Sequence, residues 1–242
     1  MASDTTAADS GTIWALDKSE LDGDTTIRVE YDPFFKKAIT YRAYPLASNL
    51  REVLDQSIDP GSLQLIFECV DGYQPHMPLE RVLDGQGYLA YQIMDLPSGT
   101  DWPDSVANKM GPFYLVWPQA KGDKRYVNPY GLAKIHIAPT EDALGPAMPE
   151  SSALMEGYEL FSSTCMKCHS INKVGGTMAP EFNHPRNITE YWTKENIWAY
   201  TQDPTSFRYN SQMPPMKGKL SRNQFEKIYA YLLGMKGKKL KE

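Results

Sequence analysis

The chain has 242 residues, of which 41% are hydrophobic and 12% aromatic, which is enough for one large domain or two small ones and excludes a disordered chain. The mean hydropathy is −0.49, and no apolar run approaches the 18 residues that a transmembrane helix needs. The net charge of −5 conceals an asymmetry. Residues 1–150 hold 12 Lys and Arg against 22 Asp and Glu, whereas residues 151–242 hold 13 against 8. We therefore expect two domains, and a basic half without clustered Arg favours an acidic protein partner over nucleic acid.

The first half carries the patterns of a sheet. Residues 1–20 are polar and predict a flexible leader. Alternation with a period of two predicts strands, and helical apolar spacing predicts one short helix at 49–54. Strands are expected at 26–31, 39–44, 63–69, 88–94, 113–117 and 133–137, with turn clusters at 59–61, 96–99 and 121–123. Residues 21–137 are thus predicted to form a β-rich α+β domain.

The second half carries the patterns of helices. The stretch 138–152 holds three prolines and no periodicity, which is typical of a linker. Beyond it, 154–162 and 221–235 are amphipathic. Ser221 is the expected N-cap of the last helix, and its expected apolar face comprises Phe225, Ile228, Tyr229 and Leu232. We predict an all-α domain over 153–242.

The motif Cys165-Met166-Lys167-Cys168-His169 carries the chemistry. Two thiols at this spacing can each add to one haem vinyl group, and the following histidine supplies an axial nitrogen to the iron. A zinc half-site would need a second Cys/His pair, for which His184 alone is a poor candidate. A thioredoxin-like pair would follow a strand, whereas the preceding segment is predicted to be helical. We predict one covalent haem c on Cys165 and Cys168, with His169 as an iron ligand.

A sixth iron ligand is offered by Met213, which lies 44 residues after His169 and directly before Pro214. Together with this Met-Pro pair, several further residues make the stretch of about 153–235 resemble the class I cytochromes c. They are Gly157, Phe161, Ala179-Pro180, Asp203-Pro204 and Ala230-Tyr231-Leu232. The resemblance implies that the first helix of the domain packs on the last, and that the Pro180 carbonyl accepts a hydrogen bond from the axial imidazole. It also implies Met213 as the ligand, with Met216 as the competitor and packing on the porphyrin as the alternative role. It places haem attachment outside the cytoplasmic membrane, so we expect a periplasmic protein whose signal peptide has been removed.

Several segments of the first half resemble the molybdopterin-binding domain of the sulfite oxidase family over about 45–140. They are Val70-Asp71-Gly72-Tyr73, Met77-Pro78-Leu79, Leu89-Ala90-Tyr91, Gly111 to Pro118 and Ala133 to Ile137. That family binds molybdenum through a cysteine in an earlier loop, and the residues before the matching region here hold none. Cys69 is interpreted as a buried small apolar residue, with a molybdenum ligand and a reactive or intermolecular thiol as alternatives. We therefore expect a truncated sulfite-oxidase-like fold without a molybdenum cofactor.

The expected function is one-electron transfer, with no catalytic residue. The alternatives are the haem subunit or part of a molybdenum-dependent sulfite-type dehydrogenase, and a haem sensor or peroxidase with an open iron site. The remaining histidines are interpreted as a surface or hydrogen-bonded residue (His136), an exposed turn residue (His76) and a loop residue (His184). A basic rim for an acidic redox partner is expected from four lysines, Lys167, Lys173, Lys217 and Lys219. Three aromatic residues are expected either to line the haem cleft or to pack in a core, namely Trp192, Trp198 and Tyr209.

Overall fold

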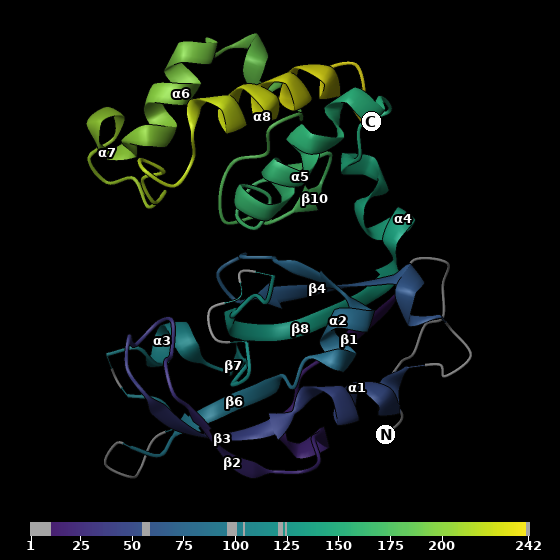
Figure 1. The fold of residues 1–242 in the computed structure, drawn as a ribbon, viewed down its shortest axis with the longest axis vertical. Coiled ribbons are helices and arrows are strands. Elements are labelled where there is room, and N and C mark those ends of the chain that lie inside the picture. Colours follow the sequence, from purple (N-terminus) through teal and green to yellow (C-terminus); the bar gives the residue numbers. More distant parts are fainter. Residues whose placement is uncertain are drawn as a thin grey trace. The chain divides into compact units, whose positions relative to one another are not determined.

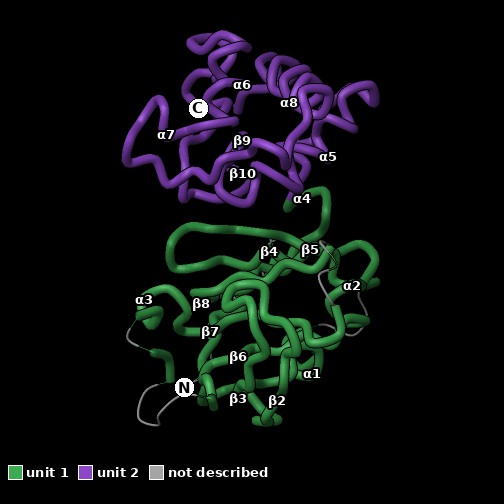
Figure 2. Tube along the Cα trace, turned by 60° about the vertical axis from the view of Figure 1, so that its left-hand side comes forward, with its two compact units in different colours: residues 1–143 green, residues 144–242 purple. Residues whose placement is uncertain are grey.

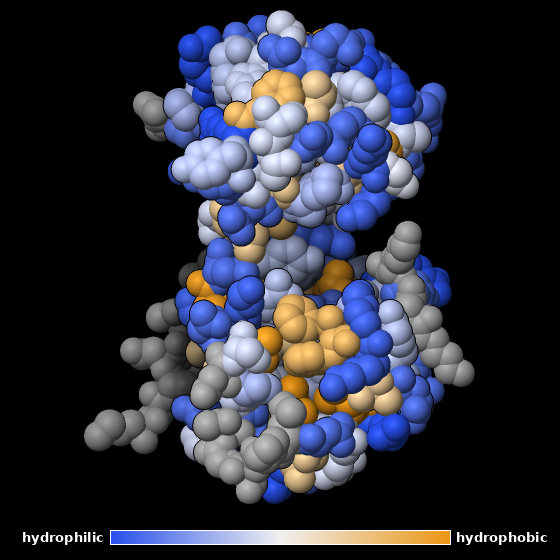
Figure 3. Space-filling view, turned by 90° about the vertical axis from the view of Figure 1, so that its left-hand side faces the viewer, coloured by the Kyte–Doolittle hydropathy of each residue, from blue (hydrophilic) through white to orange (hydrophobic). Residues whose placement is uncertain are grey.

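A computed structural model describes residues 11–54, 59–95, 101–103, 105–120, 123 and 125–240. The chain divides into two compact units, Met1–Ala143 and Leu144–Glu242 (Figure 2). On the face seen in Figure 3 the surface of both units is mostly hydrophilic, and apolar side chains are most extensively exposed on the first unit. No helix in the described part of the chain is long and apolar enough to cross a bilayer.

Unit 1 is built on an antiparallel sheet in the order β2-β3-β6-β7-β8-β4-β5, with β1 also paired to β8 (Figure 1). The strands are β1 (Thr12–Ala15), β2 (Thr25–Val29), β3 (Ile39–Pro45), β4 (Leu63–Cys69), β5 (His76–Pro78), β6 (Tyr88–Ile93), β7 (Phe113–Val116) and β8 (Tyr130–Pro139). The helices are α1 (Leu46–Val53), α2 (Leu79–Asp84) and α3 (Ala107–Met110), with 3-10 turns at Lys18–Glu20 and Pro60–Ser62.

The alternating pattern of the strands explains the core of unit 1. In β4, Leu65 and Phe67 are fully buried and pack with Ile135 of β8 in the larger of two apolar clusters that the described residues of unit 1 form. The smaller cluster centres on Tyr41 and Tyr114. Successive residues of a strand point to opposite faces, so these strands place apolar side chains on both faces of the sheet. The strands predicted around β2, β3, β4, β6, β7 and β8 and the helix predicted around α1 are confirmed within a few residues, and so is the β-rich character of the unit.

The prediction of a flexible leader over 1–20 is wrong for residues 11–20, whereas residues 1–10 lie outside the described part. β1 pairs with β8 from Thr12 opposite Ile137 to Ala15 opposite Lys134, and Trp14 is buried in the core. A four-residue strand is too short for its alternation to be noticed in a polar stretch. The predicted turn at 96–99 lies outside the described residues, as do residues 121 and 122 of the other turn.

The stretch 138–152 is not the irregular linker that its prolines predict. Ala138 and Pro139 end β8, where Pro139 lies opposite Leu63 of β4. Helix α4 (Thr140–Leu144) follows, then 3-10 turns at Gly145–Ala147 and Ser152–Leu154. Proline is compatible with a strand end and with the start of a helical turn, because neither position needs its missing N–H. The boundary between the units, after Ala143, still falls within the predicted range.

Unit 2 is mainly helical. Its helices are α5 (Met155–Thr164), α6 (Lys194–Gln202), α7 (Pro204–Phe207) and α8 (Arg222–Met235), with a 3-10 turn at Ile188–Glu190. Ser221 is the N-cap of α8, as predicted, and it also forms a capping box with Gln224. The buried face of α8 contains Tyr231, which is fully buried, whereas the predicted Tyr229 is half-buried. The prediction of an all-α domain missed the small hairpin of β9 (Ser170–Ile171) and β10 (Val174–Gly175).

Candidate functional site

Helices α5 and α8 cross in close contact, and this crossing positions the haem-attachment motif. A Cβ atom on Gly157 would lie 2.2 Å from the carbonyl oxygen of Lys227, so the two backbones approach to a distance that only glycine permits. Beside this point the rings of Phe161 and Tyr231 lie 5.3 Å apart. The packing of first helix on last helix that the resemblance implies is therefore present.

The motif forms a single turn at the end of α5. The N–H of Cys165 donates to Phe161, and the N–H groups of Cys168 and His169 both donate to the carbonyl of Cys165, at 3.1 and 3.0 Å. Both thiols are free of disulfide bonds. Burial, reinforced by Cys168, raises the pKa of the Cys165 thiol to about 12.

The imidazole of His169 is held by two contacts. Its Nδ1 lies 2.7 Å from the carbonyl oxygen of Pro180, which is the hydrogen bond that the resemblance implies. Its ring stacks on Phe182 at a centroid distance of 4.2 Å. Because a carbonyl only accepts, Nδ1 carries the proton and Nε2 keeps a free lone pair for a metal. Burial lowers the pKa of His169, which favours the neutral form that binds iron.

A glycine pair folds the following segment back onto the motif. Gly175 has a φ of +113°, and a Cβ on Gly176 would lie 2.2 Å from the carbonyl oxygen of Lys167. The N–H of Ala179 then donates to the carbonyl of Cys168 at 2.9 Å. Our reading of the sequence missed these glycines, although a Gly-Gly pair six residues after His169 is a visible signal of such an approach.

Met213 and Met216 lie in the segment between α7 and α8. The N–H of Met213 donates to Ser211 Oγ at 3.3 Å, and this oxygen lies 3.1 Å from the hydroxyl of Tyr200 on α6. Met216 is held more directly, because its N–H donates to the carbonyl of Thr201 at 2.9 Å. Both side chains are half-buried.

The remaining residues of unit 2 that the sequence singled out have different surroundings. Trp192 packs on Tyr200 at 5.3 Å, and Trp198 packs on Phe225 at 5.1 Å, so both make aromatic packing contacts. Tyr209, in contrast, is 92% exposed. His184 is half-buried. Among the four lysines expected at the rim, three are exposed and Lys167 is half-buried, with its pKa lowered by burial.

The singled-out residues of unit 1 do not assemble into a site. Cys69 is 3% exposed at the end of β4, and burial raises its pKa, which fits the interpretation as a buried small residue. His136 is half-buried, with Nε2 2.5 Å from Glu68, and is thus the hydrogen-bonded residue expected. His76 begins β5 and is half-buried, so the prediction of an exposed turn residue is wrong. No group of three or more possible metal-binding side chains occurs among the residues that the structure describes.

Comparison with known proteins assigns part of the chain. The family model described as cytochrome C oxidase, cbb3-type, subunit III matches residues 152–232. This match supports a C-terminal cytochrome c domain. It leaves the first half unassigned, so that unit 1 is described as a β-rich sheet domain and the sulfite-oxidase-like resemblance rests on its motifs alone. A search of curated proteins found no match.

The residues of unit 2 fit a haem c. Two cysteines that form no disulfide lie on one turn, the adjacent imidazole has Nε2 available, and the Gly175–Gly176 segment lies against the backbone of that turn. The thiols and imidazole are the donors that covalent attachment and iron ligation require, and they come from one short segment within the matched region.

Proposed function

We propose that this chain is a periplasmic monohaem c-type cytochrome that transfers one electron at a time. The thiols of Cys165 and Cys168 would hold the haem, and His169 and Met213 would be the iron ligands. The observation that carries the proposal is the His169–Pro180 hydrogen bond beside two cysteines on one turn that form no disulfide, within the region that matches the cytochrome family.

The protein groups have distinct roles in this function. The haem would supply an iron that alternates between the ferrous and ferric states. Pro180 orients the imidazole of His169 and strengthens it as a donor by accepting the Nδ1 proton. A methionine thioether favours ferrous iron and so raises the reduction potential. With both His169 and Met213 bound, the iron would keep the same ligands in its two oxidation states, which would limit reorganisation.

Met213 is a better candidate than Met216 for this thioether. The backbone N–H of Met216 is bound to Thr201, and its carbonyl accepts from the N–H groups of Lys219 and Leu220, so its backbone belongs to a turn. Met213 directly precedes Pro214, and proline stiffens the backbone that would present the sulfur.

The redox partner is proposed to carry an acidic docking surface. Residues 151–242 have a net charge of +5, and Lys173, Lys217 and Lys219 are exposed in the same unit as the haem-attachment motif. Electrostatic attraction would speed the encounter without requiring a large interface, which suits a carrier that must dissociate quickly.

Haem staining after denaturing gel electrophoresis tests covalent attachment, and the stain should remain at the full chain mass. Metal analysis should find about one iron per chain. Loss of the stain after acid-acetone extraction would contradict the thioether assignment, and molybdenum at one atom per chain would favour the dehydrogenase alternative.

The ligand choice is tested by Met213→Ala with Met216→Ala as its matched control. Met213→Ala should abolish the far-red sulfur-to-iron band of the ferric protein, lower the potential and let carbon monoxide bind, because it removes a soft ligand and opens a coordination position. Met216→Ala should leave all three nearly unchanged. The opposite pattern would make Met216 the ligand, and ready binding of carbon monoxide by the unaltered protein would favour a sensor or peroxidase.

A further inference from the structure

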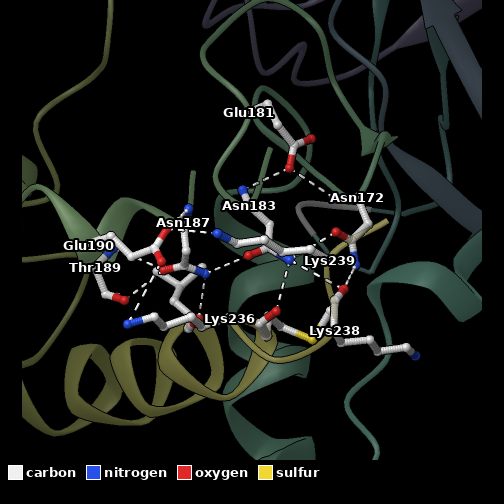
Figure 4. Close-up of polar contacts among 11 residues, drawn as sticks. Asn172, Glu181, Asn183, Asn187, Thr189, Glu190, Lys236, Lys238 and Lys239 are labelled. Carbon is white, nitrogen blue, oxygen red and sulfur yellow. Dashed lines mark hydrogen bonds and ion pairs between the residues drawn. The ribbon is translucent and has the colours of Figure 1, made fainter. Parts of the chain in front are cut away.

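Three buried asparagines form a continuous chain of hydrogen bonds in unit 2 (Figure 4). Asn172 is 2% exposed, and Asn183 and Asn187 are fully buried. The side-chain amide of Asn187 donates to Asn183 Oδ1 at 2.7 Å, and that of Asn183 donates to Asn172 Oδ1 at 2.9 Å. Buried amides at this density are unusual, because each must find partners to replace water.

The same amides bind the end of α8 and the chain beyond it. Asn187 donates to the carbonyl of Leu232 at 2.9 Å, Asn183 to that of Met235 at 2.8 Å, and Asn172 to that of Lys238 at 2.6 Å. The last carbonyls of a helix have no partner within the helix. One role of these three asparagines is therefore to cap the C-terminal end of α8.

Glu181 lies in the segment 172–183, which joins the first two asparagines, and its carboxylate binds both ends of that segment. Its Oε1 accepts hydrogen bonds from the backbone N–H of Asn172 at 2.9 Å and from that of Asn183 at 2.8 Å. Its Oε2 accepts one from the backbone N–H of Lys173 at 3.2 Å. The two ends of segment 172–183 are thus held together twice, by this carboxylate and by the bond between the two asparagine side chains.

Both groups that hold the imidazole of His169 belong to this closed segment. Pro180, whose carbonyl binds Nδ1, directly precedes Glu181, and Phe182, whose ring stacks on the imidazole, directly precedes Asn183. The N–H of Phe182 also donates to the carbonyl of Ser170 at 2.9 Å. Any shift of Asn183 or Glu181 therefore moves a group that touches His169.

We propose that Asn183 and Glu181 are positioning residues for the axial histidine. They fix the Pro180 carbonyl and the Phe182 ring, and through them the orientation of the His169 imidazole relative to the haem plane. The proposal rests on the proposed function, because it treats His169 as the haem ligand. A role confined to capping α8 would affect stability alone, so the two roles can be separated.

The test follows the Nδ1 proton of His169 in the haem-loaded full-length protein. In the ferrous state, NMR measures its exchange with solvent, and in the ferric state the haem methyl shifts report the orientation of the axial ligands. Asn183→Ala and Glu181→Gln should each speed the exchange at least about tenfold and alter the spread of the methyl shifts. Glu181 is half-buried and the substitution preserves its volume, so this variant decides the question if Asn183→Ala does not fold.

Tyr231→Phe is the matched control. It removes a buried hydrogen bond of 2.6 Å from the Tyr231 hydroxyl to the carbonyl of Ala147, and leaves segment 172–183 intact. It should lower the melting temperature while keeping the exchange within about twofold of the unaltered protein. Equal exchange and unchanged methyl shifts in all three variants would overturn the positioning role and leave a helix cap. Absence of covalent haem in the unaltered protein, measured by its pyridine haemochrome, would overturn both this proposal and the proposed function.

Discussion

The two units fill their interiors with different chemistry. In unit 1, two apolar clusters pack on the sheet, and the buried polar residues of its described part are Asp32, Asn49 and Gln64. In unit 2, the aromatic contact between α5 and α8 adjoins a row of buried asparagines. The sheet pairs its own backbone groups between strands, whereas the segment after His169 has only the two-residue pairing of β9 with β10 and is irregular beyond Gly175. Buried irregular backbone therefore needs side-chain partners, and here amides and a carboxylate supply them.

The largest expected effect comes from blocking haem attachment with Cys165→Ser and Cys168→Ser together. Unit 2 should lose its cooperative thermal transition, because a group that binds only the folded unit stabilises it and would occupy part of its interior. Unit 1 should keep its own thermal transition, because its apolar core does not include the haem. Calorimetry of both proteins measures this, and two unchanged transitions in the variant would show that unit 2 folds without its haem.

A smaller effect is expected from Gly157→Ala at the helix crossing. The added Cβ would collide with the Lys227 carbonyl, which lies 2.2 Å from its ideal position. Overpacking against backbone should lower the free energy of unfolding of unit 2 by about 3 kcal/mol, as measured by denaturant unfolding. Gly218→Ala is the control, because Gly218 has a φ of +75° and open space around its Cβ position, so that only backbone strain of about 1 kcal/mol is expected. An equal loss in the free energy of unfolding for the two variants would mean that α5 and α8 do not approach each other closely at Gly157.

The smallest effect is a pH dependence confined to unit 1. Partial burial of Glu68 acts to raise its pKa, but hydrogen bonds from Lys134 and His136 outweigh burial and hold the pKa below its ordinary value. A lowered pKa means that the stabilisation is present above the unfolded pKa near 4.5 and is lost as the pH falls through the folded value. Glu68→Gln should therefore lower the stability of unit 1 by less than about 1 kcal/mol at pH 7, and this loss should shrink as the pH is lowered below 4.5. Thermal melts of both proteins at a series of pH values measure the difference, and a gap that does not shrink as the pH falls would assign the effect to packing.

Local signals in the sequence were sufficient for much of the molecule. The alternation of β4 identifies Leu63–Cys69, and Ser221 marks the start of α8, because a strand period and a helix cap depend on neighbours within a few residues. The two cysteines and His169 are likewise recognisable from their spacing alone. Even the contact of His169 with Pro180 was expected, but only from the resemblance to a family.

Other features depend on residues that are far apart in the chain, and only the tertiary structure decided them. Trp14 is part of the core because β1 pairs with β8, more than 100 residues later. Asn172, Asn183 and Asn187 look like ordinary loop residues in the sequence, and they become a buried row because the end of α8 supplies carbonyls that need donors. The sequence by itself determined where helices, strands and the haem-attachment motif lie, since these follow from short-range periodicity and spacing. The pairing of distant backbone groups decided which polar residues are buried, because a buried donor or acceptor must find its partner wherever the fold brings one.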